Sequence, residues 1–412
     1  VNKQMKQKIK EFIAEQYANY VKDLEILTNI DSGNGDAAGT EEANQFVASK
    51  MQELGATVEF RRNDRATHLI TRLQGTGKLV ILLVAHIDTV FKKGEPERRP
   101  FRVDANDIAH GPGVGDDKAT VVQVIYGLKA LQAAGFKDYK EIIFYSNGEE
   151  EGGSPTAEGI VAELAQQADL AVIMDVTRPN WGIVTQRKGN AKYEVNITGI
   201  GGHHGNDSQI CANAISELGF LITKLYGMAS PMPGNPSEFT PAALEARGIQ
   251  DRGQFIPANT INVGVISSTN DKISVIPADA YAQVNVRCYT VEEQQRLDHD
   301  IKALAGKGTV PGTTIEITGG IVTGPMEKTN EVQKMIDIYS QIVKEEYGGE
   351  VVEWVAGGLT DGNRTAKYIP TLDALGVDNF DEHTDHETVN LKMVVPRTTA
   401  FALTLVELAK RG

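Results

Sequence analysis

The chain is poor in cysteine and in positive charge, and each shortage excludes a class of protein. Among its 412 residues are two cysteines, Cys211 and Cys288, far apart and in no CxxC spacing, so neither a disulfide framework nor a cysteine zinc knuckle is expected. Asp and Glu number 55 against 41 Lys and Arg, a formal net charge of −14, which argues against a nucleic-acid partner. Small substrates or metal cations suit this charge better.

The sequence also lacks long hydrophobic runs. The longest, over residues 79–85, is about a third of what a bilayer crossing needs, so no membrane partner is expected. The first 20 residues are charged and amphipathic and lack the apolar core of a signal peptide, which makes the cytoplasm the default location. A first residue of Val leaves earlier removal of a segment open.

Length and apolar periodicity predict a large α/β domain interrupted by a smaller one. One long helix is expected over 5–30, and the run at 79–85, apolar on both faces, is expected at the centre of a sheet. After residue 187 the order becomes β, α, β, β, α, β, as in a ferredoxin-like module. The insertion is placed at 188–319 and the larger domain at 1–187 and 320–412, with a helix over 330–347.

Acidic and histidine side chains follow several apolar strands. His86 and Asp88 come directly after the most hydrophobic one, and three consecutive glutamates, Glu149 to Glu151, come after another. Asp175 follows a third strand, where α/β sheets place ligands. Taken one at a time, these motifs have ordinary explanations: His86 and Asp88 could be a surface histidine beside a turn aspartate, and the three glutamates a solvated turn.

Two further segments add carboxylates and imidazoles. Residues 111–118 read GPGVGDDK, a Gly-rich loop that delivers Asp116 and Asp117 to the start of a helix, and one of these is not needed as a cap. A late loop contains His383 and Glu387. Because strand ends converge in a sheet, a site of His and carboxylate ligands is expected, suited to zinc, manganese or cobalt.

Eight short motifs occur in one order along nearly the whole chain and together resemble a known family. They are HIDT at His86, GDDKA at Gly115, EEEGG at Glu149, MD at Met174, GGHHG at Gly201, VIPADA at Val275, GLTDGN at Gly358 and HTDHE at His383. The chain is similar to the M20 group of co-catalytic metallopeptidases, which includes glutamate carboxypeptidase, peptidase T, and the acetylornithine and succinyl-diaminopimelate deacylases. The resemblance implies a mixed-sheet, di-zinc exopeptidase-like catalytic domain with an inserted ferredoxin-like dimerisation or lid domain, and a homodimer.

The resemblance also implies a ligand set for two divalent ions, most simply zinc. His86, Asp116 and Asp175 would hold one ion, and Asp116, Glu150 and His383 the other, with Asp88 supporting His86. The bridging Asp116 would be followed by a cis peptide bond.

The resemblance gives the general base as Glu149, since a Gly follows the base by three residues in similar members. A one-residue shift, with Glu150 as base and Glu151 as ligand, stays open. In the first register, the acid usual before the paired glutamates is replaced by Gly148.

In the inserted domain, the resemblance implies two residues that act on substrate. His203, with His204 as its neighbouring alternative, would stabilise the oxyanion in the partner subunit, and Arg287 would clamp a substrate carboxylate. Gly358 and Thr360 of the GLTDGN motif are further substrate-binding candidates.

The expected reaction is metal-dependent hydrolysis of an amide bond in a small peptide, through a hydroxide shared by the two ions. An N-acyl amino acid deacylase is the alternative. An inactive metal-binding scaffold is a hypothesis of another class, which retention of the ligands and base disfavours. A nucleotide site is not expected, because GTGK at 75–78 precedes a strand and lacks the remaining P-loop residues.

Overall fold

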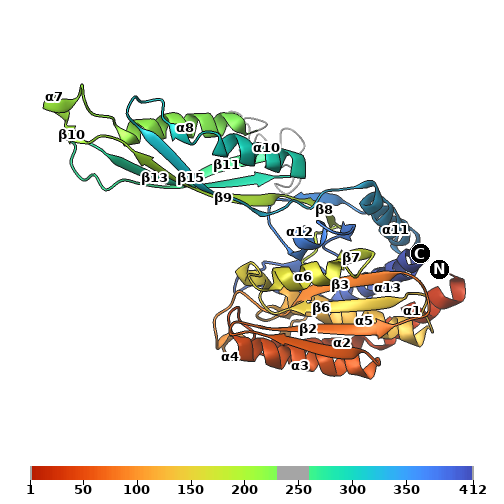
Figure 1. Ribbon diagram of the computed structural model, residues 1–412. Coiled ribbons are helices and arrows are strands. Elements are labelled where there is room, and N and C mark those ends of the chain that lie inside the picture. Colours follow the sequence, from red (N-terminus) through yellow and green to blue (C-terminus); the bar gives the residue numbers. More distant parts are fainter. Residues whose placement is uncertain (1, 230–258, 411–412) are drawn as a thin grey trace. The chain divides into compact units, whose positions relative to one another are not determined.

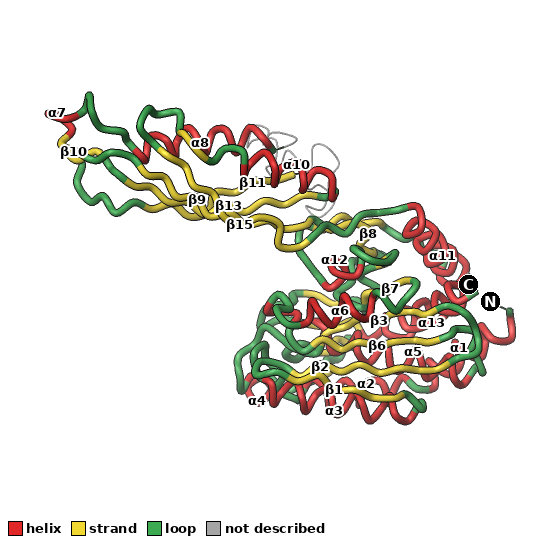
Figure 2. Tube along the Cα trace, viewed as in Figure 1, coloured by secondary structure: helices red, strands yellow, loops and turns green. Residues whose placement is uncertain are grey.

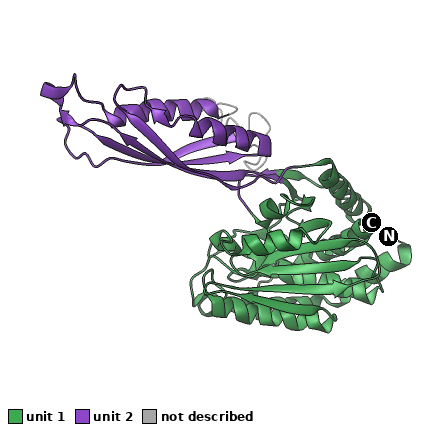
Figure 3. Ribbon diagram, in the orientation of Figure 1, with its two compact units in different colours: residues 1–185, 328–354, 360–412 green, residues 186–327, 355–359 purple. Residues whose placement is uncertain are grey.

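The computed structural model describes residues 2–229 and 259–410, which form two compact units (Figures 1 and 3). Unit 1 comprises Val1–Thr185, Lys328–Trp354 and Thr360–Gly412, and unit 2 comprises Gln186–Glu327 and Val355–Leu359. The main segment of unit 2 encloses the predicted insertion at 188–319. Helices and a mixed sheet together make the α/β architecture that the sequence predicts.

Unit 1 contains a six-stranded mixed sheet in the order β1-β2-β6-β3-β7-β17. Strand β3 pairs in parallel with β6 and β7, whereas β2 is antiparallel to both β1 and β6. Every residue of β3 is buried, as its continuous apolar run predicts. The strands are β1 (Thr57–Arg62), β2 (Thr67–Gln74), β3 (Val80–His86), β6 (Glu141–Asn147), β7 (Leu170–Ile173) and β17 (Thr371–Leu372).

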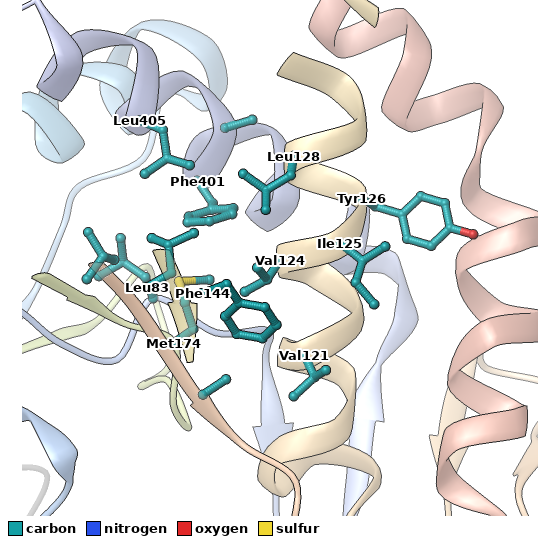
Figure 4. Close-up of a cluster of buried hydrophobic side chains, with 14 of the residues drawn as sticks. Leu83, Val121, Val124, Ile125, Tyr126, Leu128, Phe144, Met174, Phe401 and Leu405 are labelled. Carbon is teal, nitrogen blue, oxygen red and sulfur yellow. The ribbon is translucent and has the colours of Figure 1, made fainter. Parts of the chain in front are cut away.

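Helices cover both faces of this sheet. Successive residues of β3 point to opposite faces, so they pack into two different hydrophobic cores. Leu82 packs with apolar residues of α6. On the other face, Leu83 and Phe144 lie with Val124 of α5 and Phe401 of α13 (Figure 4). The longer helices after the N-terminal pair are α3 (Ala37–Glu53), α5 (Ala119–Ala133), α6 (Ala157–Ala165), α11 (Asn330–Tyr347) and α13 (Val394–Ala409), and the short ones are α4 (Glu95–Arg98) and α12 (Asp361–Thr365).

The prediction of a single helix over 5–30 is wrong. Two helices, α1 (Lys3–Glu15) and α2 (Tyr17–Thr28), meet at Gln16, whose backbone leaves the helical region at φ −86° and ψ 1°. Both helices bury apolar side chains in the same core. The apolar periodicity therefore continues across the break and could not reveal it.

A small four-stranded sheet, in the order β18-β19-β5-β4, brings two loops of unit 1 together. The loop 381–387 connects β18 to β19, and the Gly-rich loop follows β5. Because Thr388 of β19 lies opposite His110 of β5, the end of the late loop lies beside the start of the Gly-rich loop. The strands are β4 (Arg102–Val103), β5 (Ile108–His110), β18 (Asn379–Phe380) and β19 (Thr388–Asn390).

Unit 2 has the strand order of a ferredoxin-like module, β15-β9-β13-β11, with neighbouring strands antiparallel and β14 added at the β15 edge. Helices α8 and α10 cover one face, visible in Figure 2. Alternation of buried and exposed residues along β9 gives the sheet one apolar and one polar face. The elements are β9 (Gly189–Thr198), α8 (Ala214–Met228), β11 (Asn259–Ser267), β13 (Asp279–Cys288), α10 (Val291–Lys302), β14 (Gly306–Lys307) and β15 (Thr314–Thr323).

Short elements complete the units. Strands β8 and β16 pair with each other, and the boundary between the units falls within both. Their bounds, with those of the small elements of unit 2, are β8 (Ile183–Arg187), β16 (Glu353–Ala356), β10 (Gly202–His203), α7 (His204–Asp207) and β12 (Val275–Ile276). In the described part of the chain, no helix is both long and apolar enough to cross a membrane.

Candidate metal centre

Three neighbouring strands of unit 1 deliver polar residues to the same edge of the sheet. His86, the last residue of β3, lies opposite Asn147, the last residue of β6. The N–H of Met174 donates to the carbonyl of Val84 at 2.7 Å, which brings Asp175 to the same edge. These parallel strands end together, so residues distant in the sequence become neighbours.

The Gly-rich loop enters this edge through a tight turn. Residues Val114–Lys118 form a kinked turn that leads into α5, with a non-helical backbone at Asp116 (φ −117°, ψ 86°) and Asp117 (φ −132°, ψ 20°). The peptide bond between Asp116 and Asp117 is cis, as the family resemblance implies. Lys118, not an aspartate, is the N-cap residue of α5, so the Asp116 carboxylate is free of capping and points to the histidines.

The Asp116 carboxylate lies between two histidines. His86 Nε2 is 2.8 Å from Oδ1, and His383 Nε2 is 3.0 Å from Oδ2. Although burial disfavours charge on both groups, these hydrogen bonds raise the pKa of His86 and lower that of Asp116. The bond to Asp116 raises the pKa of His383 to about 9, and the charge of Glu151 adds to it.

Glu151 completes a compact group of possible ligands. Its Oε2 atom is 3.3 Å from His383 Nε2. His86, Asp116 and Glu151 each offer one ligand atom, and these atoms lie within 4.8 Å of one another. Burial raises the pKa of Glu151 to about 8.

Asp88 joins the histidine to the glutamate triplet. His86 Nδ1 lies 3.1 Å from the backbone carbonyl oxygen of Asp88 and 3.4 Å from its Oδ1 atom. The same Oδ1 atom accepts the N–H of Glu150 at 2.9 Å. Its Oδ2 atom accepts the N–H of Glu151 at 3.0 Å and the side-chain amide of Asn34 at 2.9 Å. Asp88 is fully buried. This one residue therefore contacts the metal-ligand candidate His86, mainly through its carbonyl, and holds the backbone of two glutamates through its carboxylate.

The three adjacent glutamates, Glu149 to Glu151, have different surroundings. The Glu149 carboxylate is turned away to the start of α6, where its Oε1 atom accepts the Thr156 hydroxyl at 2.7 Å and the Ala157 N–H at 2.8 Å. Glu151, and not Glu150, lies beside His383 and Asp116. This placement agrees with the one-residue shift, in which Glu150 would be the base and Glu151 a ligand.

Glu150 lies among other carboxylates. Burial raises its pKa well above the ordinary value, and the negative charges of Asp175, Asp361 and Asp88 raise it further. Asp175 is itself buried and follows β7. It is not one of the three residues whose ligand atoms lie within 4.8 Å of one another.

Glu387 is a supporting residue whose role could not be seen in the sequence. Its carboxylate is buried and accepts three backbone N–H groups of the Gly-rich loop, from Gly113 at 3.0 Å and from Gly115 and Asp116 at 2.9 Å. Burial raises its pKa to about 7 against the effect of these bonds. The motif HTDHE contained the signal, but nothing in it identified backbone groups as the partners.

The substrate-binding candidates in the GLTDGN motif differ in their surroundings. Thr360 is buried and caps α12: its hydroxyl accepts the N–H of Gly362 at 3.0 Å and donates to Asp373 at 2.9 Å. Gly358 is exposed, and its carbonyl accepts a bond from Arg187 at 3.3 Å within unit 2. The Thr360 hydroxyl therefore has a structural task, and Gly358 has open space beside its Cα.

His203 and Arg287 belong to unit 2. His203 is exposed at the end of β10, and its N–H donates to Asp207 at 2.9 Å. His204, its neighbour, is also exposed. Arg287 lines a groove of about 1160 Å³ with residues of β9, β11, β13 and β15. Its Nε donates to Asn285 at 3.2 Å, whereas Nη1 is buried without a hydrogen-bond partner in the described residues.

The residues at the sheet edge fit divalent ions. Imidazole and carboxylate are the ligands that zinc, manganese and cobalt accept. Several carboxylates share one buried site, an arrangement that costs free energy unless positive charge is supplied. Oε1 of Glu151 is buried with no hydrogen-bond partner in the described residues, and coordination to a cation would stabilise it.

Comparison with known proteins agrees with this site. Residues 82–407 match the model of peptidase family M20/M25/M40. The chain belongs to this family. Family M20 members act as metallo-hydrolases on amide bonds, and the ligand group of unit 1 is consistent with that chemistry.

Relatives of this M20 chain include both peptidases and deacylases. It is 28% identical over 395 residues to carboxypeptidase G2 of Pseudomonas sp. strain RS-16, covering 94% of this chain and 88% of that protein. It is 23% identical over 379 residues to succinyl-diaminopimelate desuccinylase of Bordetella avium, covering 88% and 92%. Among solved structures, aminopeptidase PepT of Bacillus cereus has a similar fold, with a TM-score of 0.76 at 18% identity, over 95% of this chain and 99% of that one.

Proposed function

We propose that this M20 chain is an exopeptidase that hydrolyses the amide bond of a small peptide with two divalent ions bound in unit 1. The observation that carries the proposal is the approach of His86 and His383 to the two oxygens of Asp116, at 2.8 and 3.0 Å, beside Glu151. A carboxylate with an imidazole at each oxygen suits a ligand shared by two ions.

The proposed ligands combine these contacts with Asp175, which the family resemblance implies and which is buried after β7 at the same edge. His86, Asp116 and Asp175 would hold one ion, and Asp116, Glu151 and His383 the other. Zinc suits this nitrogen and oxygen set, as do manganese and cobalt. Asp88 would orient His86 through its second ring nitrogen, the common arrangement for a metal-bound histidine.

Glu150 is the proposed general base. When bound, the ions supply Lewis-acid activation of a water molecule and of the substrate carbonyl. Glu150 would accept the proton of that water as its oxygen attacks the carbonyl carbon, and would deliver the proton to the amine as the carbon–nitrogen bond breaks. Its burial among carboxylates favours proton uptake.

Unit 2 would supply contacts to substrate and to a second copy of the chain. Arg287 is proposed to bind a free substrate carboxylate bidentately, and its unpartnered Nη1 supports this role. His203 is proposed to stabilise the oxyanion across a homodimer. The exposed Val265 and Ile266 on β11, the terminal strand of the sheet, support an interface there.

A deacylase is the second candidate, favoured by the match to the desuccinylase. The deciding experiment compares dipeptides, tripeptides and N-acyl amino acids with a common leaving amino acid, with zinc, manganese or cobalt loaded. Each substrate is paired with its carboxyl-terminal amide, which Arg287 could not clamp. Faster hydrolysis of peptides supports the proposal, and faster hydrolysis of acyl compounds identifies a deacylase. No turnover of any substrate by metal-loaded protein would indicate an inactive scaffold.

A further inference from the structure

Glu149 has a task outside the proposed chemistry. Its side chain is fully buried, with 0% exposed, and its Oε1 atom accepts three hydrogen bonds at the start of α6: from the N–H of Thr156, the hydroxyl of Thr156 and the N–H of Ala157. A carboxylate here binds N–H groups that have no partner within the helix and lies at the positive end of its dipole.

The backbone of Glu149 is held equally firmly. Its N–H donates to Oδ1 of Asn147 at 3.0 Å, and its carbonyl accepts the N–H of Ser154 at 3.0 Å. The next two residues donate their N–H groups to Asp88. The segment that carries Glu150 and Glu151 is thus tied to α6 on one side and to Asp88 on the other.

We infer that Glu149 is a positioning residue, which holds the 3₁₀ turn Glu150–Gly152 against α6 and so sets the places of Glu150 and Glu151. This inference rests on the proposed function for the roles of those two residues. Because Glu149 acts through hydrogen-bond acceptance, its neutral isostere should preserve much of the effect. A general base at this position would not tolerate the same change.

The test compares Glu149→Gln, Glu149→Ala and Glu150→Gln in the full chain. Glutamine keeps the Oε1 acceptor and the side-chain shape, so kcat should stay within about tenfold of the parent. Alanine removes the acceptor, and kcat should fall about 10–100-fold, the usual effect of losing a residue that supports a metal ligand. The effect should fall on kcat more than on KM, because substrate contacts are unchanged.

Glu158→Gln is the matched control. Glu158 is exposed in the first turn of the same helix, so this change removes a charge at the helix start without touching the acidic turn, and kcat should stay within about twofold. Thr156→Val, which removes one donor to Glu149, should give a loss smaller than that of Glu149→Ala.

A spectroscopic reading separates the inference from the proposed function. With Co²⁺ bound, the visible absorption reports ligand geometry, and it should change in Glu149→Ala while remaining near that of the parent in Glu149→Gln. This holds even if no substrate is turned over. An unchanged spectrum and kcat in Glu149→Ala would overturn the inference, as would a loss in Glu149→Gln equal to that in Glu150→Gln, which would make Glu149 the base.

Discussion

Nε2 of His383 lies 3.0 Å from Oδ2 of Asp116, although one residue stands in the late loop of the chain and the other in its Gly-rich loop. Two features produce this approach. The pairing of β19 with β5 places the end of the late loop beside the start of the Gly-rich loop. Glu387, the last residue of the late loop, binds the backbone of the Gly-rich loop. His383 itself is 53% exposed, so its position depends on this frame and not on burial.

Replacing the proposed base should separate catalysis from metal binding. We expect Glu150→Gln to lower kcat about 10²–10⁴-fold, because the proton of the attacking water loses its acceptor. Elemental analysis should find the same metal content as in the parent, since Glu150 is not a proposed ligand. Activity within threefold of the parent would show that the base is another residue.

Removing His383 should lower the metal content. We expect His383→Ala to bind one ion tightly where the parent binds two, because His383 is a proposed ligand of one site. The measurement is metal content per chain after dialysis against a weak chelator. His386→Ala, an exposed histidine of the same loop, is the control and should keep both ions. Equal metal content in the two variants would contradict the ligand assignment.

Glu387 should stabilise the fold through the Gly-rich loop. In Glu387→Gln an amide N–H₂ replaces one oxygen that accepts backbone N–H groups, so we expect the free energy of unfolding to fall by about 1.5–3 kcal/mol, the range for bonds to a charged group. Urea unfolding measures the change. Asp385→Asn, at an exposed acid of the same loop, is the control and should cost much less. A loss of similar size in both variants would show that the bonds of Glu387 to the Gly-rich loop do not account for the stability.

Glu41 should make the free energy of unfolding depend on pH in the acidic range. Hydrogen bonds from Arg62 at 2.7 Å, with smaller contributions from Thr67 and Gln45, lower its pKa from 4.5 to about 2 despite its partial burial. A carboxylate whose pKa is lower in the folded than in the unfolded chain stabilises the fold at any pH above its unfolded-state pKa. This stabilisation is lost as pH falls from about 4.5 towards 2. The parent should therefore exceed Glu41→Gln in unfolding free energy at pH 6, with the difference shrinking at pH 4 and pH 3.

The exposed neighbouring position supplies the control for this pH series. Glu42→Gln removes the same charge from the same helix. Its difference from the parent should be small at every pH. A Glu41→Gln difference that stays constant from pH 6 to pH 3 would show that the ion pair with Arg62 does not set the acid dependence.

Some of this structure follows from local patterns. The apolar run before His86 predicts a buried central strand, and strand ends in a sheet converge, so the histidine and the acids after the strands could be expected at one edge. The helix α11 lies at the residues that its periodicity predicts. The break at Gln16 could not be predicted, because the apolar pattern continues across it.

The sequence by itself determined the chemical character of the site: an acidic chain without usable cysteines, in which His86, Asp116 and His383 occur in the order of a metallopeptidase family. It could not determine which of three adjacent glutamates has which task, since the three side chains are chemically identical. Tertiary structure gives the three different surroundings, because α6 supplies donors for Glu149 while Asp88 binds the N–H groups of the next two residues. The surroundings of each glutamate depend on contacts with other elements, α6 and the residue after β3, which form when the chain packs.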